Sequence, residues 1–211
     1  MKPLFISFEG IEGCGKSTQA KKLHEFFLEK NISSILTREP GGTKAGEKIR
    51  EILIDGKITK LEAKTELFLN FAARLEHIEK LIKPALQEKQ TVICDRFFDS
   101  TYAYQGNAFG LDKKLIDDVK KMTIGNFAPD ITFLIDLPVD VAFRRIDGRS
   151  ENNRYEQMGL DFHQKVRDGF LFLANKNSRI KKIDGTKNQQ EISLEIIDEL
   201  IKKNLLLLTS K

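Results

Sequence analysis

A glycine-rich segment at residues 10–18, GIEGCGKST, constrains this chain more than any other part of its sequence. It matches the pattern G-x-x-x-x-G-K-S/T, follows the apolar run FISFE directly and precedes the amphipathic segment TQAKKLHEFFLEK. In that setting the glycines let the backbone turn tightly and point its N–H groups at phosphate oxygens, and the following helix adds the positive end of its dipole. The segment therefore predicts a nucleoside triphosphate site between a strand and a helix.

This phosphate-binding loop offers several kinds of ligand group. The residues expected at the nucleotide are Gly10, Ile11, Glu12, Gly13, Cys14, Gly15, Lys16, Ser17 and Thr18. Lys16 is expected to neutralise the β- and γ-phosphates, and Thr18 to approach the α-phosphate, while Ser17 offers Mg²⁺ the kind of oxygen ligand it prefers. The alternative is a glycine-rich turn that binds no nucleotide. The guanine motif N-K-x-D and the switch motif D-x-x-G after a strand are not found, which favours ATP over GTP.

Apolar runs and helical periodicity alternate along the 211 residues. Runs rich in Ile, Val and Phe predict five strands, at residues 4–8, 34–37, 91–94, 131–135 and 180–183. Helical periodicity predicts helices at residues 17–30, 45–54, 62–88, 112–123, 139–146, 161–175 and 190–205. Near-continuous apolar strands separated by helices are typical of a parallel sheet covered on both faces. We therefore expect an α/β fold with a five-stranded parallel sheet, in one domain over residues 1–211.

Composition and termini exclude several other classes of protein. The net charge is +4, and basic residues are interleaved with acidic ones, so a nucleic-acid groove is not indicated. The apolar run at the N-terminus is too short for a signal peptide, and the C-terminal apolar pieces fall short of the roughly 20 residues that span a bilayer. Neither cysteine belongs to a metal-binding or disulfide pattern. We expect a cytoplasmic protein without membrane or nucleic-acid partners, whose ligand is a small anion.

A second polar segment follows the predicted strand at residues 91–94. Asp95 stands at the carboxyl end of that strand, where ligands of open α/β sheets collect. Its carboxylate is expected to hold Mg²⁺ or orient Lys16, and the alternative is a helix N-cap. The guanidinium of Arg96 is expected to clamp an acceptor phosphate through two parallel hydrogen bonds, and the alternative is a surface ion pair.

Five motifs together resemble the thymidylate kinase family. They are FEGIEGCGKST at 8–18, TREPGGT at 37–43, RLEHIEKLIKPAL at 74–86, DRFFDSTYAYQG at 95–106 and NRYE at 153–156. The resemblance runs nearly end to end. It implies a P-loop nucleoside monophosphate kinase fold in which ATP, with Mg²⁺, phosphorylates dTMP to dTDP. It also implies a homodimer, for which the apolar faces of the helices at 62–88 and 112–123 are candidates, although core packing explains such faces equally well.

The polar insert DGRSENNRY at residues 147–155 interrupts a helical pattern, which indicates a mobile flap. The resemblance makes it the lid of the kinase domain. In members whose phosphate-binding loop lacks an arginine, lid arginines stabilise the transferring phosphoryl group, and these match Arg149 and Arg154. Together with Lys16, Asp95 and Arg96 they form the expected catalytic set. The alternative for the insert is a solvated loop.

The resemblance also places the acceptor nucleotide. Arg50 and Arg96 are expected on its phosphate, Glu12 near the sugar 3′-hydroxyl, Tyr104 near the sugar and Arg74 near thymine O4. The residues expected along the base or as walls of the site are Glu39, Pro40, Ser100, Thr101 and Gln105. Core packing is the alternative for Tyr104.

One position departs from the family pattern. A phenylalanine that stacks on thymine often stands four residues before the arginine aligned with Arg74, and this chain has Asn70 there. Either Phe71 serves instead, although it lies about 100° away around a helix, or other contacts replace the stacking. The departure keeps two further hypotheses open: a kinase for dUMP or another monophosphate, and a regulatory protein that binds ATP without transferring phosphate. His24, His77 and His163 are expected to take no part in catalysis.

Overall fold

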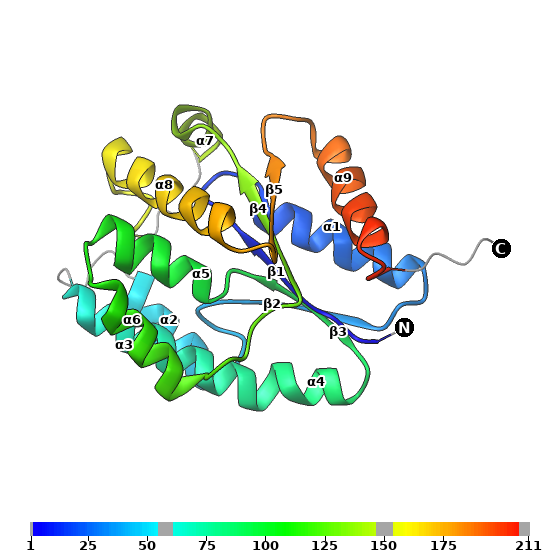
Figure 1. Cartoon of the computed structure of the whole chain (residues 1–211), viewed down its shortest axis with the longest axis horizontal. Helices are drawn as coiled ribbons and strands as arrows, with labels where there is room; N and C mark the ends of the chain where they lie inside the picture. Colours follow the sequence, from blue (N-terminus) through cyan, green and yellow to red (C-terminus); the bar gives the residue numbers. More distant parts are fainter. Residues whose placement is uncertain (1, 55–60, 147–153, 207–211) are drawn as a thin grey trace.

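The computed structural model describes residues 2–54, 61–146 and 154–206. Its centre is one sheet of five parallel strands in the order β2-β3-β1-β4-β5 (Figure 1). The strands are β1 (Phe5–Glu9), β2 (Ser34–Arg38), β3 (Thr91–Asp95), β4 (Ile131–Asp136) and β5 (Ile180–Asp184). The predicted α/β fold and the five predicted strands are confirmed, and each strand begins and ends within one residue of its expected limits.

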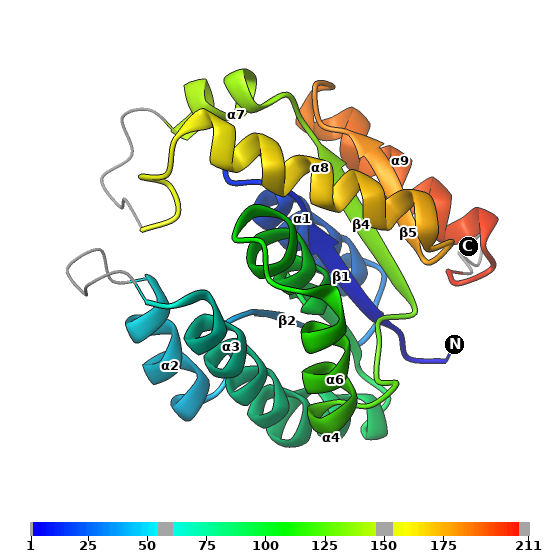
Figure 2. The same cartoon turned by 60° about the vertical axis from the view of Figure 1, so that its left-hand side comes forward.

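Helices connect the strands and cover both faces of the sheet. They are α1 (Lys16–Glu29), α2 (Lys44–Ile54), α3 (Ala63–His77), α4 (Lys83–Gln87), α5 (Phe98–Thr101), α6 (Lys113–Thr123), α7 (Val139–Ile146), α8 (Leu160–Lys176) and α9 (Gln189–Lys202). Helices α1 and α9 pack together on one face, whereas α4 and α8 pack on the other (Figure 1). Helix α2 contacts α3 and lies outside it, away from the sheet (Figure 2).

The predicted helix at 62–88 is a continuous helical run in which a π-helical turn, η1 (Ile78–Ile82), separates α3 from α4. Pro84 stands just after this turn. Proline lacks an N–H, and its ring crowds the carbonyl four residues earlier in a regular helix. The wider turn, in which the Lys83 N–H bonds to the Ile78 carbonyl, accommodates the proline without ending the helix.

One helical segment was not predicted. It consists of α5 and a second π-helical turn, η2 (Tyr102–Ala108). Its N-cap, Phe97, makes no side-chain capping bond. Instead the carboxyl group of Glu9, at the end of β1, accepts hydrogen bonds from the backbone N–H groups of Phe97 (2.8 Å) and Ser100 (3.3 Å). Because the cap comes from a distant strand, the local sequence carries no start signal for this helix.

Two hydrophobic clusters make up the core. The first joins β1 and β4 to α1, α7, α8 and α9, and the second joins β3 to α3, η1 and α6. Both faces of β1 and β4 are buried, as their near-continuous apolar runs predicted. Among the described helices, none is both long enough and apolar enough to cross a membrane.

Candidate active site

The phosphate-binding loop lies at the carboxyl end of β1, pressed against β4 and α7. Gly10 has φ +142°, and a Cβ there would lie 2.6 Å from the Ile135 carbonyl oxygen. Gly13 has φ +75°, and a Cβ there would lie 2.5 Å from the Ala142 carbonyl oxygen. Any larger residue at either position would strain the backbone and collide with a neighbouring carbonyl, so these glycines fix the loop's path.

A polar cavity opens over this loop. Its lining comes from the loop and the start of α1, from the ends of β2 and β3, from α2 and from the segment before α8: Glu12, Gly13, Gly15, Lys16, Ser17, Thr18, Arg38, Glu39, Arg50, Asp95, Arg96 and Glu156. Lys16 opens α1, and its ammonium group donates to the Ile11 carbonyl at 3.3 Å. The Ser17 hydroxyl donates to Asp95 Oδ2. The predicted loop residues from Glu12 to Thr18, except Cys14, therefore meet Asp95 and Arg96 at this cavity. Gly10, Ile11 and Cys14 do not line it, and Ile11 and Cys14 are buried in the first core cluster.

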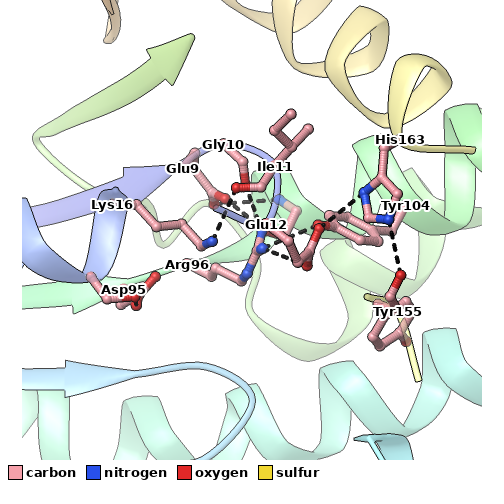
Figure 3. A network of polar contacts seen from close by, with 12 residues as sticks. Glu9, Gly10, Ile11, Glu12, Lys16, Asp95, Arg96, Tyr104, Tyr155 and His163 are labelled. Carbon is pink, nitrogen blue, oxygen red and sulfur yellow. Dashed lines mark hydrogen bonds and ion pairs between the residues drawn. The ribbon is translucent and has the colours of Figure 1, made fainter. Parts of the chain in front are cut away.

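Arg96 is the central cation of the site (Figure 3). Its guanidinium donates to the Gly10 carbonyl (3.0 Å), the Ser100 hydroxyl (3.1 Å) and Glu12 Oε1 (2.8 Å). Its backbone has φ +71°, a left-handed conformation that costs a residue with a Cβ about 1 kcal/mol or more. The fold stabilises this conformation by bonding the Arg96 N–H to the Phe8 carbonyl at 2.8 Å, which aims the side chain across the phosphate-binding loop.

Glu12 is held from three sides (Figure 3). Besides Arg96, the Tyr104 hydroxyl lies 2.6 Å from Glu12 Oε2, and His163 Nδ1 lies 3.3 Å from the same oxygen. Burial on its own would raise the pKa of the Glu12 carboxyl, but the charge of Arg96, the His163 contact and the charge of Lys16 hold that pKa well below its usual range. Glu12 is therefore an ionised, oriented acceptor.

A second cavity adjoins the first. It is lined by Glu12, Glu39, Pro40, Arg50, Leu53, Ile54, Asn70, Arg96, Ser100, Thr101, Tyr104, Gln105 and Tyr155. Most of these residues are those that the sequence assigned to the acceptor nucleotide, whereas Leu53, Ile54 and Tyr155 were not predicted. The cavity lies between α2, α3 and the α5–η2 segment.

Two residues expected at the acceptor lie behind the wall of this cavity. Phe71 is 1% exposed and packs in the second core cluster, with the Arg74 guanidinium 4.8 Å from its ring centre. Arg74 bonds to Glu39 at 2.7 Å and to Thr101 at 3.2 Å, and is 3% exposed. Asn70, one residue away and so turned by about 100° around α3, is the residue that lines the cavity. Phe71 therefore does not replace the stacking phenylalanine in this structure.

Of the two arginines expected in the lid, the structure describes only Arg154. Arg149 lies outside the described residues, as do residues 147–153 of the predicted lid. Arg154 is described, and its guanidinium pairs with Glu66 Oε1 on α3 at 2.6 Å. From this segment it is Glu156 that lines the cavity over the phosphate-binding loop. Arg154 would have to leave Glu66 to reach a transferring phosphoryl group.

A sequence model of the family described as "Thymidylate kinase" matches residues 8–196. The thymidylate kinase of Carboxydothermus hydrogenoformans is 44% identical over 196 residues, covering 93% of this chain and 96% of that protein. The thymidylate kinase of Wolbachia pipientis wMel is 46% identical over 204 residues, covering 93% of this chain and 100% of that protein.

The chain belongs to the thymidylate kinase family.

The fold agrees with this membership. A crystal structure of the thymidylate kinase from Ehrlichia chaffeensis superposes with a TM-score of 0.75 at 40% identity, covering 95% of this chain and 99% of that one. The resemblance to the thymidylate kinase family and the P-loop nucleoside monophosphate kinase fold are thus both confirmed. Two adjoining cavities suit thymidylate kinases, which bring a phosphoryl donor and dTMP together.

Several buried polar residues of this site were not predicted from the sequence. Glu9 caps α5, and Glu66 forms an ion pair with Arg154. His77 is fully buried, with Nδ1 3.0 Å from Glu39 Oε1, and His163 is fully buried between Glu12 and the Tyr155 carbonyl. The available signal was a charged or titratable residue at a position that helical or strand periodicity assigns to the core, because such residues are rarely buried without a partner.

Glu9 gives the protein a pH-sensitive stability. Burial and the neighbouring Asp99 raise the pKa of the Glu9 carboxyl from 4.5 to about 8, against the opposing effect of Arg96. The pKa of Glu9 is higher in the folded state than in the unfolded state. At pH values between these two pKa values, the folded state therefore binds more protons than the unfolded state. The stabilisation is therefore complete below about pH 4.5 and is lost as the pH rises through about 8.

We predict that Glu9→Gln flattens this dependence, since the amide can still accept from Phe97 and Ser100 but does not titrate. Urea unfolding of the wild type should show a free energy that falls between pH 5 and pH 8, by at most about 1.4 kcal/mol per pH unit from this group. The variant should show a shallower slope, and Glu25→Gln on the exposed face of α1 should keep the wild-type slope. Equal slopes in the wild type and Glu9→Gln would contradict the assignment.

Proposed function

We propose that this chain transfers the γ-phosphoryl group of ATP to dTMP, with ATP over the phosphate-binding loop and dTMP in the adjoining cavity. One observation carries the proposal: the two cavities share a wall made of Glu12, Glu39, Arg50 and Arg96. Phosphates bound in the two cavities would therefore meet across two guanidinium groups.

The chemistry that this arrangement supports is phosphoryl transfer by positioning and charge neutralisation. The transition state spreads negative charge over the equatorial oxygens of the transferred group, and little covalent work is required of the protein. Lys16 stands at the donor side, and Arg96 reaches both cavities. The acceptor phosphate is already an anion, so no general base has to remove a proton first.

The test is a coupled ADP-release assay with dTMP, dUMP, dCMP, dGMP and AMP as acceptors. We expect dTMP to give the highest kcat/KM. A rate with dTMP no higher than with the others would reject it as the acceptor, and the position of Asn70 in the cavity makes dUMP the alternative to watch. Folded protein that binds ATP and phosphorylates none of the five would support a regulatory role.

We also propose that Mg²⁺ binds beside the phosphate-binding loop, held by Ser17 and Asp95. The Oδ1 atom of Asp95 is buried and, among the described residues, has no hydrogen-bond partner, while its Oδ2 already bonds to Ser17. Within the described ranges no three His, Cys, Asp or Glu side chains cluster as a metal site. Mg²⁺ needs no such cluster, because it commonly binds one or two protein oxygens plus phosphate and water. When bound, it would neutralise phosphate charge.

We predict that Asp95→Asn raises the Mg²⁺ concentration needed for half-maximal turnover by about tenfold or more, because one carboxylate charge is lost from the ion's surroundings. The measurement is turnover against free Mg²⁺ at saturating ATP and dTMP. Asp118→Asn on the exposed face of α6 is the matched control. An unchanged Mg²⁺ dependence of the Asp95 variant would remove this residue from the metal site.

The catalytic roles of Arg149 and Arg154 and the lid at residues 147–155 stay predictions, as does the treatment of residues 1–211 as one kinase domain.

We further propose a homodimer, supported by the exposed side chains of Phe68, Ala72 and Leu75, which lie on one face of α3. A monomer in sedimentation equilibrium at micromolar concentration would reject the homodimer.

We also propose a cytoplasmic location, which is supported by the free thiols of Cys14 and Cys94. Cell fractionation would test it.

A further inference from the structure

Glu66 supports the acceptor cavity from behind. It lies on α3, is 1% exposed and does not line the cavity. Its Oε2 accepts from the Gln105 amide nitrogen at 2.9 Å and from the Tyr155 hydroxyl at 2.9 Å, and its Oε1 accepts from the Arg154 guanidinium at 2.6 Å. Gln105 and Tyr155 both line the cavity. One buried carboxylate therefore fixes two groups of the cavity wall.

The contact with Glu66 fixes which way the Gln105 amide faces. Glu66 forms an ion pair with Arg154, and a carboxylate has no proton to donate. The amide of Gln105 must therefore turn its NH₂ group to Glu66. Because the amide is planar, its carbonyl oxygen Oε1 points away from Glu66, and among the described residues no group donates to it. Gln105 thus offers an acceptor to the cavity.

We propose that Glu66 is a positioning residue that determines base specificity through Gln105. An acceptor in the wall pairs with a ring N–H, which thymine and uracil carry at N3. Cytosine has a lone pair at N3, so two acceptors would face each other in a buried site, and such a mismatch is strongly disfavoured. Glu66 therefore selects thymine and uracil nucleotides against cytosine nucleotides. This inference rests on the proposed use of dTMP as the acceptor.

Arg154 acts in the same arrangement. It occupies Oε1 of Glu66 and leaves Oε2 to the two residues of the cavity wall. Its backbone N–H donates to the Ile54 carbonyl at 3.2 Å, and Ile54 also lines the cavity. The segment that follows the predicted lid is thus joined to the base-selecting wall.

The substitution Glu66→Gln tests the proposal because it changes one oxygen to an NH₂ group at nearly constant volume. A guanidinium can only donate, so the new amide keeps its oxygen opposite Arg154 and places its NH₂ where Oε2 was. Gln105 then turns its carbonyl toward residue 66 and its NH₂ toward the cavity, where it suits cytosine. We expect the ratio of kcat/KM for dCMP to that for dTMP to rise at least tenfold over the wild type, with dUMP falling in parallel with dTMP.

The matched control is Glu79→Gln, a half-exposed residue of the same helical run that pairs with Lys83, and its ratio should equal that of the wild type. A folded Glu66→Gln enzyme that loses the same factor of kcat/KM for dTMP, dUMP and dCMP would show a merely structural role and overturn the proposal. If the wild type itself fails to phosphorylate dTMP, the proposed function fails instead.

Two further variants keep the proposal falsifiable. In a Gln105→Leu background, Glu66→Gln should leave the dCMP-to-dTMP ratio unchanged, and a further rise there would show that Glu66 acts by another route. If Glu66→Gln does not fold, as judged by circular dichroism and thermal melting, Glu66→Asp replaces it, since the shorter carboxylate keeps its charge opposite Arg154 and withdraws from Gln105. An unchanged ratio in folded Glu66→Asp would overturn the proposal.

Discussion

Lys16→Ala should abolish most of the turnover while leaving the fold intact. Lys16 begins α1 and lines the cavity over the phosphate-binding loop, where we propose that its ammonium group contacts the donor phosphates. Removing one preformed group that stabilises transition-state charge lowers kcat by about 10²–10³-fold. The measurement is steady-state ADP release with saturating ATP and dTMP, together with a circular dichroism spectrum and a melting temperature.

Lys21→Ala is the matched control for this prediction. It removes the same group from α1 at a side chain that is 69% exposed and pairs with Glu25. Its kcat should equal that of the wild type. A folded Lys16→Ala enzyme with unchanged kcat would exclude Lys16 from the reaction.

Arg96→Lys should lower kcat/KM for dTMP by on the order of 100-fold, with a larger rise in the KM for dTMP than in the KM for ATP. Lysine keeps the charge but loses the planar fork that contacts Gly10, Ser100 and Glu12 together. Each charge-assisted hydrogen bond that this guanidinium would make to the acceptor phosphate is worth about 1.5–3 kcal/mol, so the loss of one or two of them accounts for such a decrease. Initial rates over a matrix of both substrate concentrations measure the two KM values.

Arg179→Lys is the control for the loss of a partly buried guanidinium group elsewhere in the fold. Arg179 pairs with Asp99 through two hydrogen bonds of 3.0 and 2.8 Å and lines neither cavity. This variant should lose stability and keep the KM for dTMP. Equal increases in both KM values for Arg96→Lys would instead place Arg96 at the shared wall without a preference for the acceptor.

The sequence predicted those parts of the fold and site that depend on local pattern. The strands were recognisable as short apolar runs, and the phosphate-binding loop was recognisable because Gly10 and Gly15 recur at a spacing that the backbone geometry demands. Asp95 and Arg96 could be placed beside the loop because parallel strands end at the same edge of a sheet.

What escaped prediction depends on contacts between distant residues. The start of α5 is set by Glu9, which is far away in the sequence. The choice between Asn70 and Phe71 depends on the rotation of α3, which packing against the second core cluster decides. Glu66 finds its partners at Gln105, Arg154 and Tyr155, and no periodicity in one sequence reveals such a meeting.

The hydrogen bonds of Glu9 have a consequence for how the two substrates are aligned. Glu9 ends β1 immediately before the phosphate-binding loop, and its carboxyl group bonds to Phe97 and Ser100, where the helix of the acceptor cavity begins. One carboxyl group therefore ties the phosphate-binding loop to the helix at the adjoining cavity and limits the motion of one relative to the other. With ATP and dTMP bound as proposed, this short path of hydrogen bonds would help to hold the attacking oxygen and the phosphorus atom at a fixed separation.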